Sequence, residues 1–432
     1  IKMNTLYKLK HKPTGLYVSA SKNNIFSLGT KGFSFLEDPT KTFNSISTPY
    51  SEIAISEFEL VTISIKSQKE KIVKKKIEEY VQKYKDTNLY DEVLKAIKEH
   101  KRYLLLGNGF SMAYNPKRFS FTSLLDNAVE RELITKTSPI YKVFTQFDTK
   151  DFEEVVKLLE TSTKVLKTYG VLSKADEEKI LADSKSLKNY LVDVITNNHP
   201  DKITEISDSE FFSSASFIKN FEKVYTLNYD LLLYWTCIKL QSFIEKEQIE
   251  DSLLDISDGF YDPYEHSTDY VVFGNDGASQ NIYFLHGGLH IYDKKSEIIK
   301  NTFSRTDKSL KEQTLENLDK DIYPIFVSEG TSEQKKAKII HNAYLNHCYK
   351  SLLSIGRTKK NESSLVVFGT LLKRNDIHIR QAILKSKVEN IYIGISKESD
   401  IKEFTNFIEQ SSKLKKAKKV YFYDYRTAKV WR

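Results

Sequence analysis

The sequence predicts an α/β protein with a Rossmann-like, mostly parallel sheet (sirtuin-like in the motif order described below), a helical insertion, and a small β-rich N-terminal domain. Three observations support this fold class. From residue 101 onward, short apolar runs without polar alternation recur between helix-like stretches, which is typical of strands buried on both faces. The region at about 145–220 contains no such run and has a helical pattern. Residues 1–66 carry only short strand-like runs.

The N-terminal part of the chain is expected to form two elements before the main domain begins. In residues 1–66, short apolar runs are broken by Pro13-Thr14-Gly15, which indicates a small β-rich domain serving assembly or sensing. Residues 67–100 then place apolar side chains at helical spacing among charges, as in YDEVLKAIKEH. We therefore expect a helical connector over 67–100, followed by the main domain over 101–432.

Short apolar runs define the strands expected in this main domain. The first is YLLL at 103–106, and the helical insertion separates it from the later runs. Those are VYTL (224–227), YVVF (270–273), IYFL (282–285), IFV (325–327), SLVVF (364–368), NIYIGI (390–395) and VYFY (420–423). Because helix-like stretches lie between several of them, we expect these strands to pair mostly in parallel.

Composition bounds the class of protein and its surroundings. The 432 residues carry a net charge of +8, which is compatible with a nucleic acid ligand but does not demand one. The lysine-rich runs at 69–76 and 413–419 are typical of solvated helix faces. Two distant cysteines, Cys237 and Cys348, indicate a reducing, cytoplasmic location. No apolar run approaches the ~20 residues of a membrane-spanning helix, so no membrane association is expected.

The residues that follow the apolar runs form the candidate site, because ligands of doubly wound sheets bind outside the carboxyl ends of the strands. Glycine is scarce, at 15 in 432 residues, yet two glycines lie within three positions directly after the first run. The full set is Gly107-Asn108-Gly109-Phe110-Ser111, Asn228-Tyr229-Asp230, His286-Gly287-Gly288, Gly369-Thr370 and, inside the run at 390–395, Gly394. We expect all of them at one edge of the sheet.

Each member of this set also has a purely structural interpretation. Glycine serves tight turns, Asn and Asp cap helices, and a single buried histidine is commonly a hydrogen-bonded core residue. The chemistry of the whole set is nevertheless coherent. A Gly-Asn-Gly turn at a helix start suits a pyrophosphate, Asn228 and Asp230 suit sugar hydroxyls, and His286 suits a general base. Together these residues indicate a dinucleotide whose ribose is attacked.

The order of these motifs resembles the sirtuin family and its divergent sirtuin-like relatives, over roughly 101–432. The family pattern is Gly-Ala-Gly-x-Ser, Thr-x-Asn-x-Asp, His-Gly, and Gly-Thr/Ser-Ser-Leu. The matching residues are Gly107, Gly109 and Ser111; Thr226, Asn228 and Asp230; His286 and Gly287; and Gly369 and Thr370. Asn108 replaces the alanine, and Leu371 stands where a serine is usual. The stretches NYDLLLYW and FLHGGLHIY further resemble sirtuin-like proteins of bacterial anti-phage defence.

This resemblance implies a role for each residue, with NAD as the substrate. The glycine turn with Asn108, Phe110 and Ser111 would hold the NAD pyrophosphate. Asn228 would position a water or stabilise the ribose, Asp230 would lie near the nicotinamide ribose, and His286 would act on a ribose hydroxyl. The other implied NAD-binding residues are Tyr229, Gly369, Thr370, Leu371 and Gly394.

One departure from the sirtuin pattern bears on the activity. Sirtuin deacylases carry a four-cysteine zinc site, which two distant cysteines cannot form, so no metal is expected and deacylation loses support. The helical insertion fits instead the defence relatives that hydrolyse NAD. The resemblance therefore implies an NAD glycohydrolase that cleaves the nicotinamide–ribose bond and depletes NAD in abortive infection.

Other functions stay open at this point. The alternatives are a non-catalytic nucleotide-binding or scaffold subunit of a defence complex, a cyclase in which an internal nucleophile replaces water, and a deacylase. The resemblance also implies a homo-oligomer, a phage-derived trigger and a HerA-type ATPase partner. Separately, Thr331 and Gln334 predict a capping box that opens a helix, and His290 is expected to be structural rather than a metal ligand.

Overall fold

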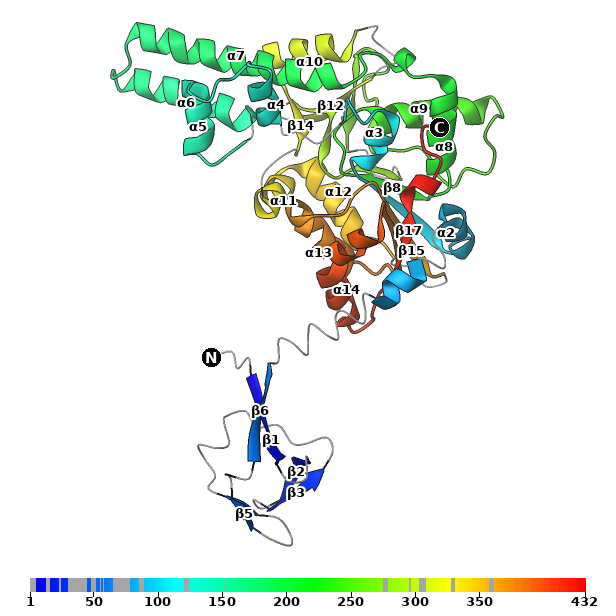
Figure 1. The fold of residues 1–432 in the computed structure, drawn as a ribbon. Helices are drawn as coiled ribbons and strands as arrows, with labels where there is room; N and C mark the ends of the chain where they lie inside the picture. Colours follow the sequence, from blue (N-terminus) through cyan, green and yellow to red (C-terminus); the bar gives the residue numbers. More distant parts are fainter. Residues whose placement is uncertain are drawn as a thin grey trace. The chain divides into compact units, whose positions relative to one another are not determined.

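The chain divides into two compact units, Ile1–Lys83 and Tyr84–Arg432 (Figure 1). The computed structural model describes residues 5–12, 16–22, 25–29, 45–47, 52–54, 56, 58–64, 78–84, 89–119, 124–150, 152–274, 279–294, 297–302, 308–327, 331–356 and 361–432. Parts of the predicted connector, 65–77 and 85–88, lie outside the described residues. Its last helix, α2 (Tyr90–Ala96), packs within the second unit against β17 (Lys419–Asp424).

The described part of the first unit is a six-stranded sheet, which confirms the β-rich N-terminal fold. β1 pairs antiparallel with both β2 and β6, and its Leu9 side chain is buried. The strand order is β5 (Glu52–Ala54), β4 (Ser45–Ser47), β3 (Ile25–Gly29), β2 (Tyr17–Lys22), β1 (Thr5–His11) and β6 (Phe58–Ser64).

Parallel strands form the central sheet of the second unit, and their order decides where a ligand can bind. The order is β11 (Ile282–Phe284), β8 (Lys223–Thr226), β7 (Lys101–Leu106), β15 (Ser363–Phe368), β16 (Asn390–Ile395) and β17. Every neighbouring pair is parallel. Counted along the chain this is the doubly wound Rossmann order 3-2-1-4-5-6. The predicted Rossmann-like sheet is therefore confirmed, and the direction of winding reverses between β7 and β15.

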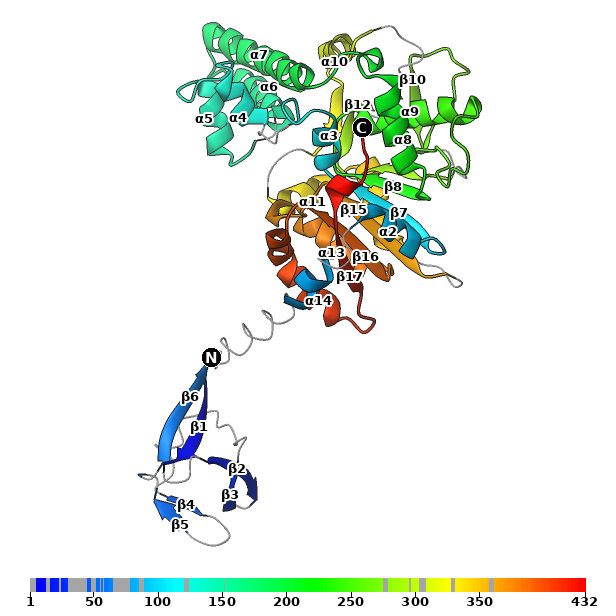
Figure 2. The same ribbon diagram turned by 45° about the vertical axis from the view of Figure 1, so that its right-hand side comes forward.

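Every residue of β15 and β16 is buried, which indicates that helices cover both faces of this sheet. Helix α12 (Ala343–Ser354) contacts β11 and α13 (Ile377–Lys385), which in turn contacts α14 (Thr405–Ser412). Helices α8 (Asp208–Ile218) and α9 (Leu232–Glu245) pack against each other. Figure 2 shows these helices around the central sheet. Within the part of the chain that the structure describes, short 3-10 helices are η3 (Ile203–Glu205), η5 (Arg374–Asp376), η6 (Glu398–Phe404) and η7 (Tyr425–Thr427).

The helical insertion lies between β7 and β8, where the described residues contain no strand, as predicted. It comprises α3 (Gly109–Tyr114), α4 (Leu124–Glu130), α5 (Pro139–Gln146), α6 (Phe152–Thr168) and α7 (Lys174–Asn198), followed by α8. The long helices α6 and α7 pack side by side and extend away from the sheet (Figures 1 and 2). Among the helices that the structure describes, none is both long enough and apolar enough to cross a membrane.

A second, antiparallel sheet holds two runs that the sequence places in the parallel sheet. Its order is β14 (Tyr323–Phe326), β12 (Gly287–Lys294), β13 (Glu297–Asn301), β10 (Tyr270–Phe273) and β9 (Phe260–Tyr261). The expectation that 270–273 and 325–327 join the parallel sheet is therefore wrong. A short apolar run reports burial but not its pairing partner. Here β12 and β13 form a hairpin, β14 pairs with β12, and β10 pairs with β13.

The helices before and after β14 pack on different neighbours, the first on the second sheet and the second on α12 and α13. Helix α10 (Leu310–Asp319) contacts β14 and α7. Helix α11 (Ser332–His341) begins with the predicted capping box, in which the Thr331 hydroxyl accepts from the Gln334 N–H and the Gln334 side chain accepts from the Thr331 N–H. The capping interpretation of Thr331 and Gln334 is therefore confirmed.

Candidate functional site

Two turns pack backbone against backbone at the point where the sheet reverses its winding. The Gly109 N–H donates to the Gly369 carbonyl at 2.8 Å, and the Gly107 N–H donates to the Phe368 carbonyl at 2.9 Å. A Cβ on Gly109 would lie 2.4 Å from the Gly369 Cα, and a Cβ on Gly107 would lie 2.3 Å from the Thr370 Cβ. The close approach of the turns after β7 and β15 therefore requires glycine at 107 and 109.

The same contacts limit what the Gly-Asn-Gly turn can offer to a ligand. The N–H groups of Gly107 and Gly109 are used between the two turns, and the Phe110 N–H donates to the Gly107 carbonyl at 2.9 Å. The Asn108 side chain donates to the Phe119 carbonyl at 2.8 Å, so it braces the segment after α3. In this conformation, these four groups are satisfied inside the protein rather than directed at a pyrophosphate.

Three polar side chains, Asn228, Ser111 and Asp230, form one buried hydrogen-bonded set beside this turn. The Asn228 amide donates to the Gly107 carbonyl at 3.1 Å and to the Ser111 hydroxyl at 2.9 Å. Ser111 in turn donates a short hydrogen bond to the Asp230 carboxylate. Asp230 also accepts from the N–H of Leu232, the first residue of α9, at 2.9 Å, so it contacts the start of this helix and orients Ser111 at the same time.

Burial decides the charge state of Asp230. Loss of solvation raises the pKa of this carboxyl to about 6, although hydrogen bonds from Ser111 and the Leu232 N–H oppose the rise. At neutral pH the group is therefore mainly ionised, and it is an acceptor for Ser111.

His286 lies at the junction between the two sheets. Its carbonyl accepts from the Val327 N–H at 2.8 Å. The next residue, Gly287, has φ +73°, and a Cβ there would lie 1.9 Å from the Ile325 carbonyl oxygen. Three residues further on, the Leu289 N–H donates to the carbonyl of Tyr229, the residue directly after Asn228, at 2.8 Å. The backbone thus holds His286 against β14 and joins it to the Asn228 set.

The other side of His286 contacts residues that the sequence reading missed. Its Nε2 lies 3.3 Å from the Nε2 of His378, whose Nδ1 lies 3.0 Å from the Ser332 hydroxyl. Beside them, the Lys335 ammonium lies 3.2 Å from the Asp376 carboxylate. Ser332 begins α11 and His378 lies in the first turn of α13. Both residues lie at the start of a helix that follows a strand. A search for polar residues that continued from each strand end to the start of the next helix would have included them.

Both imidazoles are neutral at physiological pH. Burial lowers the pKa of His286 to about 3, with the Lys335 charge adding to the effect. Burial likewise lowers the pKa of His378 to about 3, with further contributions from His286 and Lys335 that Asp376 opposes. The pair therefore offers neutral donors and acceptors rather than positive charge.

The same residues can be tested as a metal centre. One ligand atom each from His286, Asp376 and His378 lies within 4.8 Å of the others. However, the buried Lys335 ammonium already pairs with Asp376 and supplies the positive charge that a cation would bring. The arrangement is therefore better described as two neutral histidines joined by an N–H···N hydrogen bond than as a metal centre.

Phe110 connects the candidate site to the last residues of the chain. Its ring lies 5.3 Å from the Trp431 ring, and the Trp431 indole N–H donates to the Phe110 carbonyl at 3.0 Å. The Trp431 ring also packs against Tyr114 and Phe211. Phe110 is thus a core residue of α3, and its contacts bring residue 431 to the edge of the sheet.

The remaining predicted residues have contacts that shape the turns. The Thr370 hydroxyl accepts from the Leu372 N–H at 3.0 Å, and the Leu371 carbonyl accepts from Arg380 at 2.9 Å. The Tyr229 ring lies 5.3 Å from the Phe326 ring. A Cβ on Gly394 would lie 3.0 Å from the Tyr423 ring, so close packing accounts for that glycine.

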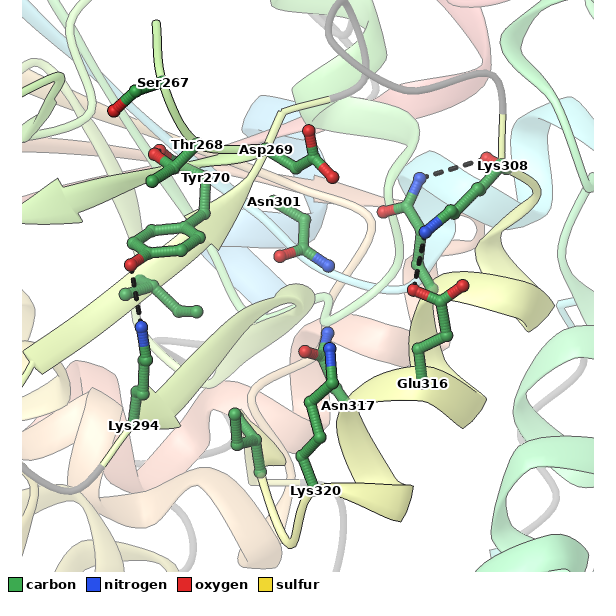
Figure 3. A pocket seen from close by; sticks show the side chains of 13 residues that line it. Ser267, Thr268, Asp269, Tyr270, Lys294, Asn301, Lys308, Glu316, Asn317 and Lys320 are labelled. Atoms are coloured by element: carbon green, nitrogen blue, oxygen red, sulfur yellow. Dashed lines mark hydrogen bonds and ion pairs between the residues drawn. The ribbon is translucent and has the colours of Figure 1, made fainter. Parts of the chain in front are cut away.

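A separate pocket lies between the antiparallel sheet and α10 and contains none of these residues (Figure 3). Lys294 donates to the Tyr270 hydroxyl at 2.7 Å, and Lys308 pairs with Glu316 at 2.7 Å. The first contact joins a charged group to a neutral hydroxyl, and the second is an ion pair across the pocket lining. The lining residues are Ser267, Thr268, Asp269, Tyr270, Lys294, Ile299, Asn301, Lys308, Gln313, Glu316, Asn317, Lys320 and Ile322.

The strand order and the polar set at its reversal point define the class: a doubly wound α/β protein with its candidate site at the carboxyl edge, where proteins of this class bind nucleotides. A family model described as a domain of unknown function, DUF4917, matches residues 104–431. The chain therefore belongs to the DUF4917 family. No curated protein matches the sequence.

Gly287→Ala is expected to destabilise the protein more than Gly170→Ala. Both glycines have positive φ, +73° and +66°, so alanine strains each backbone by about 1 kcal/mol. Only at Gly287 does the new Cβ meet a backbone carbonyl, whereas nothing lies within 4 Å at Gly170. Urea unfolding should show a further loss of about 2 kcal/mol for Gly287→Ala. Equal losses would contradict the contact between Gly287 and β14.

Asp230→Asn is expected to flatten the pH dependence of stability between about pH 4 and 6. Folding raises the pKa of this carboxyl from 3.8 to about 6, so in this range the folded state holds a proton that the unfolded state has lost. The free energy of unfolding therefore falls as pH rises, by about 3 kcal/mol in total. Unfolding measured at several pH values checks the slope. An identical slope in wild type and variant would refute the raised pKa.

Proposed function

We propose that this chain is an NAD glycohydrolase that cleaves the nicotinamide–ribose bond, as its sirtuin-like motif order implies. One observation carries the proposal: Asn228 and His286 follow the paired parallel strands β8 and β11, and Asn228 bonds to the Gly107 turn at the edge where the doubly wound sheet reverses its winding. Ligands of such sheets bind at that position. The proposal therefore rests on place in the fold as well as on sequence motifs.

Asn228 is proposed to orient the attacking water. Its amide nitrogen donates to both Gly107 and Ser111, which fixes the side chain and leaves Oδ1 facing the other way. From there Oδ1 can accept a hydrogen from a water placed against the ribose carbon. Asp230 holds Ser111 and, through it, the amide, so we assign Asp230 an orienting role.

His286 is proposed to act on a ribose hydroxyl. Burial lowers the pKa of the imidazole to about 3, so the ring stays unprotonated and keeps a nitrogen lone pair that can accept a hydrogen bond. Accepting a hydrogen bond from the hydroxyl raises electron density on the ribose as the nicotinamide leaves. This supports the positively charged, oxocarbenium-like state through which the glycosidic bond breaks. Water then captures the sugar and gives ADP-ribose.

Asn228→Ala and His286→Ala are each expected to lower nicotinamide release from NAD by about 100-fold or more, because each removes a group that acts in the transition state. The matched controls are Asn346→Ala, a half-buried side chain on α12, and His341→Ala, an exposed side chain on α11, and both should keep full activity. Nicotinamide release by the full chain is followed by chromatography. Activity that survives both substitutions would place the chemistry elsewhere.

The products separate this proposal from its alternatives. Cyclic ADP-ribose would identify a cyclase, acyl-lysine turnover a deacylase, and NAD binding without any turnover a nucleotide-binding subunit. NAD hydrolysis that depletes the cell would fit the abortive-infection role in the cytoplasm that the resemblance implies. A HerA-type ATPase and a phage-derived trigger are the implied partners of that role.

A homo-oligomer belongs to the same proposal, with the first unit as the assembly element. The full chain is then expected to have a mass in solution that is a multiple of 50.1 kDa. Deleting residues 1–83 should lower that multiple, as measured by light scattering. An oligomer that keeps its stoichiometry after the deletion would exclude the assembly role.

A further inference from the structure

The α6–α7 pair extends away from the sheet (Figures 1 and 2), and its far end exposes apolar side chains. These are Val165, Leu166, Tyr169, Val171 and Leu181, of which Tyr169 is 78% exposed and Val171 is 69% exposed. Fifteen large hydrophobic side chains are exposed in the part of the chain that the structure describes, so one third of them lie within 17 residues. Apolar groups gathered in this way mark a surface that contacts a partner.

The segment 164–183, here called the hairpin tip, has no core of its own. None of its twenty residues is buried, although the chain is helical up to Thr168 and again from Lys174. Burial begins at Thr163 and Ser184, just outside the tip. Helical turns without a packed face gain too little free energy to offset the conformational entropy that is lost on ordering. A surface that covers the tip would provide the missing apolar burial.

The charges of the hairpin tip indicate what kind of surface covers it. The tip has four lysines and four acidic residues, so its net charge is zero. The signs are divided between the helices, because residues 164–168 of α6 carry +2 and residues 174–183 of α7 carry −2. Anionic lipid and nucleic acid attract net positive charge, which the tip lacks. A partner with the opposite division of charge fits instead, and a second copy of the tip, turned around, has this division.

We propose that the hairpin tip is an interface at which two copies of this chain pair about a two-fold axis. The axis places α6 of one copy against α7 of the other, so the +2 segment faces the −2 segment twice. Two helical hairpins paired in this way form a four-helix bundle, whose centre buries the apolar side chains. The interface lies on the second unit. It is therefore distinct from the assembly role proposed for the first unit, and it does not depend on NAD hydrolysis.

Two charged side chains of the tip are available for contacts between the copies. Lys167 is already used inside its own hairpin, where it pairs with Glu177 at 2.6 Å. Lys164 on α6 and Glu178 on α7 are exposed, and neither has an ion-pair partner among the residues that the structure describes. In the two-fold arrangement, Lys164 of each copy belongs to the basic segment and Glu178 to the acidic segment that faces it.

Cross-linking of the full chain tests the interface directly. Cys237 and Cys348 are both buried, so Ala175→Cys, at an exposed position in the first turn of α7, introduces a readily accessible thiol. A bis-maleimide linker should join two such chains into a species of twice the 50.1 kDa chain mass. The matched control is Ala337→Cys, at an exposed alanine on α11, which should remain a single chain. Equal cross-linking of the two variants would overturn the proposal.

Charge reversal in the Ala175→Cys chain tests the two-fold arrangement. Lys164→Glu alone and Glu178→Lys alone each place like charges across the axis, so each should slow cross-linking about tenfold. An equimolar mixture of the two variants places a lysine opposite a glutamate in both contacts of the mixed pair, and cross-linking should recover. A folding defect within one chain cannot be repaired by mixing. Reversals without effect, or a mixture that does not recover, contradict the interface.

The apolar part of the tip separates a second copy from a lipid surface. Tyr169→Asp should abolish cross-linking of the Ala175→Cys chain, whereas Phe147→Asp, at another exposed aromatic residue, should not. Vesicles of phosphatidylcholine and phosphatidylserine are the lipid probe. If Tyr169→Asp removes vesicle binding and leaves cross-linking intact, the tip contacts a membrane and the proposal is wrong. If wild type fails to hydrolyse NAD, the proposed function falls, and the interface is still decided by the cross-links.

Discussion

Gly109 and Gly369 approach each other so closely that neither turn has room for a side chain, and this contact sets the geometry of the whole edge. It joins the end of β7 to the end of β15, the two strands between which the winding reverses. Because the two turns bond to each other, the carbonyl of Gly107 faces the Asn228 amide and Ser111 faces Asp230. The polar groups of the site thus take their positions from a backbone contact.

From that contact, hydrogen bonds continue across the edge through elements far apart in the sequence. Asn228 follows β8, His286 follows β11, and His378 opens α13. The second sheet matters here, because β14 fixes the backbone of His286 and leads into α11, which supplies Ser332. The antiparallel sheet therefore forms one wall of the candidate site rather than a separate appendage.

The sequence was sufficient for the parallel sheet and for much of the edge, because strand ends in a doubly wound fold must meet. Asn228 and His286 could be found by that rule alone. His378 and Ser332 lie beyond the strand ends, at the starts of the next helices, and their contact across 46 positions depends on how α11 and α13 pack. The sequence could not predict which sheet 270–273 and 325–327 join either, because strands of both sheets appear in the sequence as short apolar runs. The sequence does not decide whether the Asn108 side chain contacts a ligand or braces the turn, and its hydrogen bond to the Phe119 carbonyl supports the bracing role.

The two tryptophans of the chain give this edge an optical label of its own. The Trp431 indole donates a hydrogen bond to the Phe110 carbonyl beside the glycine turn, and Trp235 lies in α9, whose first residue donates its N–H to Asp230. Both indoles are buried. Any rearrangement of α3 or of the start of α9 changes the surroundings of one of only two tryptophans. Tryptophan fluorescence of the unmodified protein, excited at wavelengths that the 26 tyrosines do not absorb, therefore reports on movement at the candidate site.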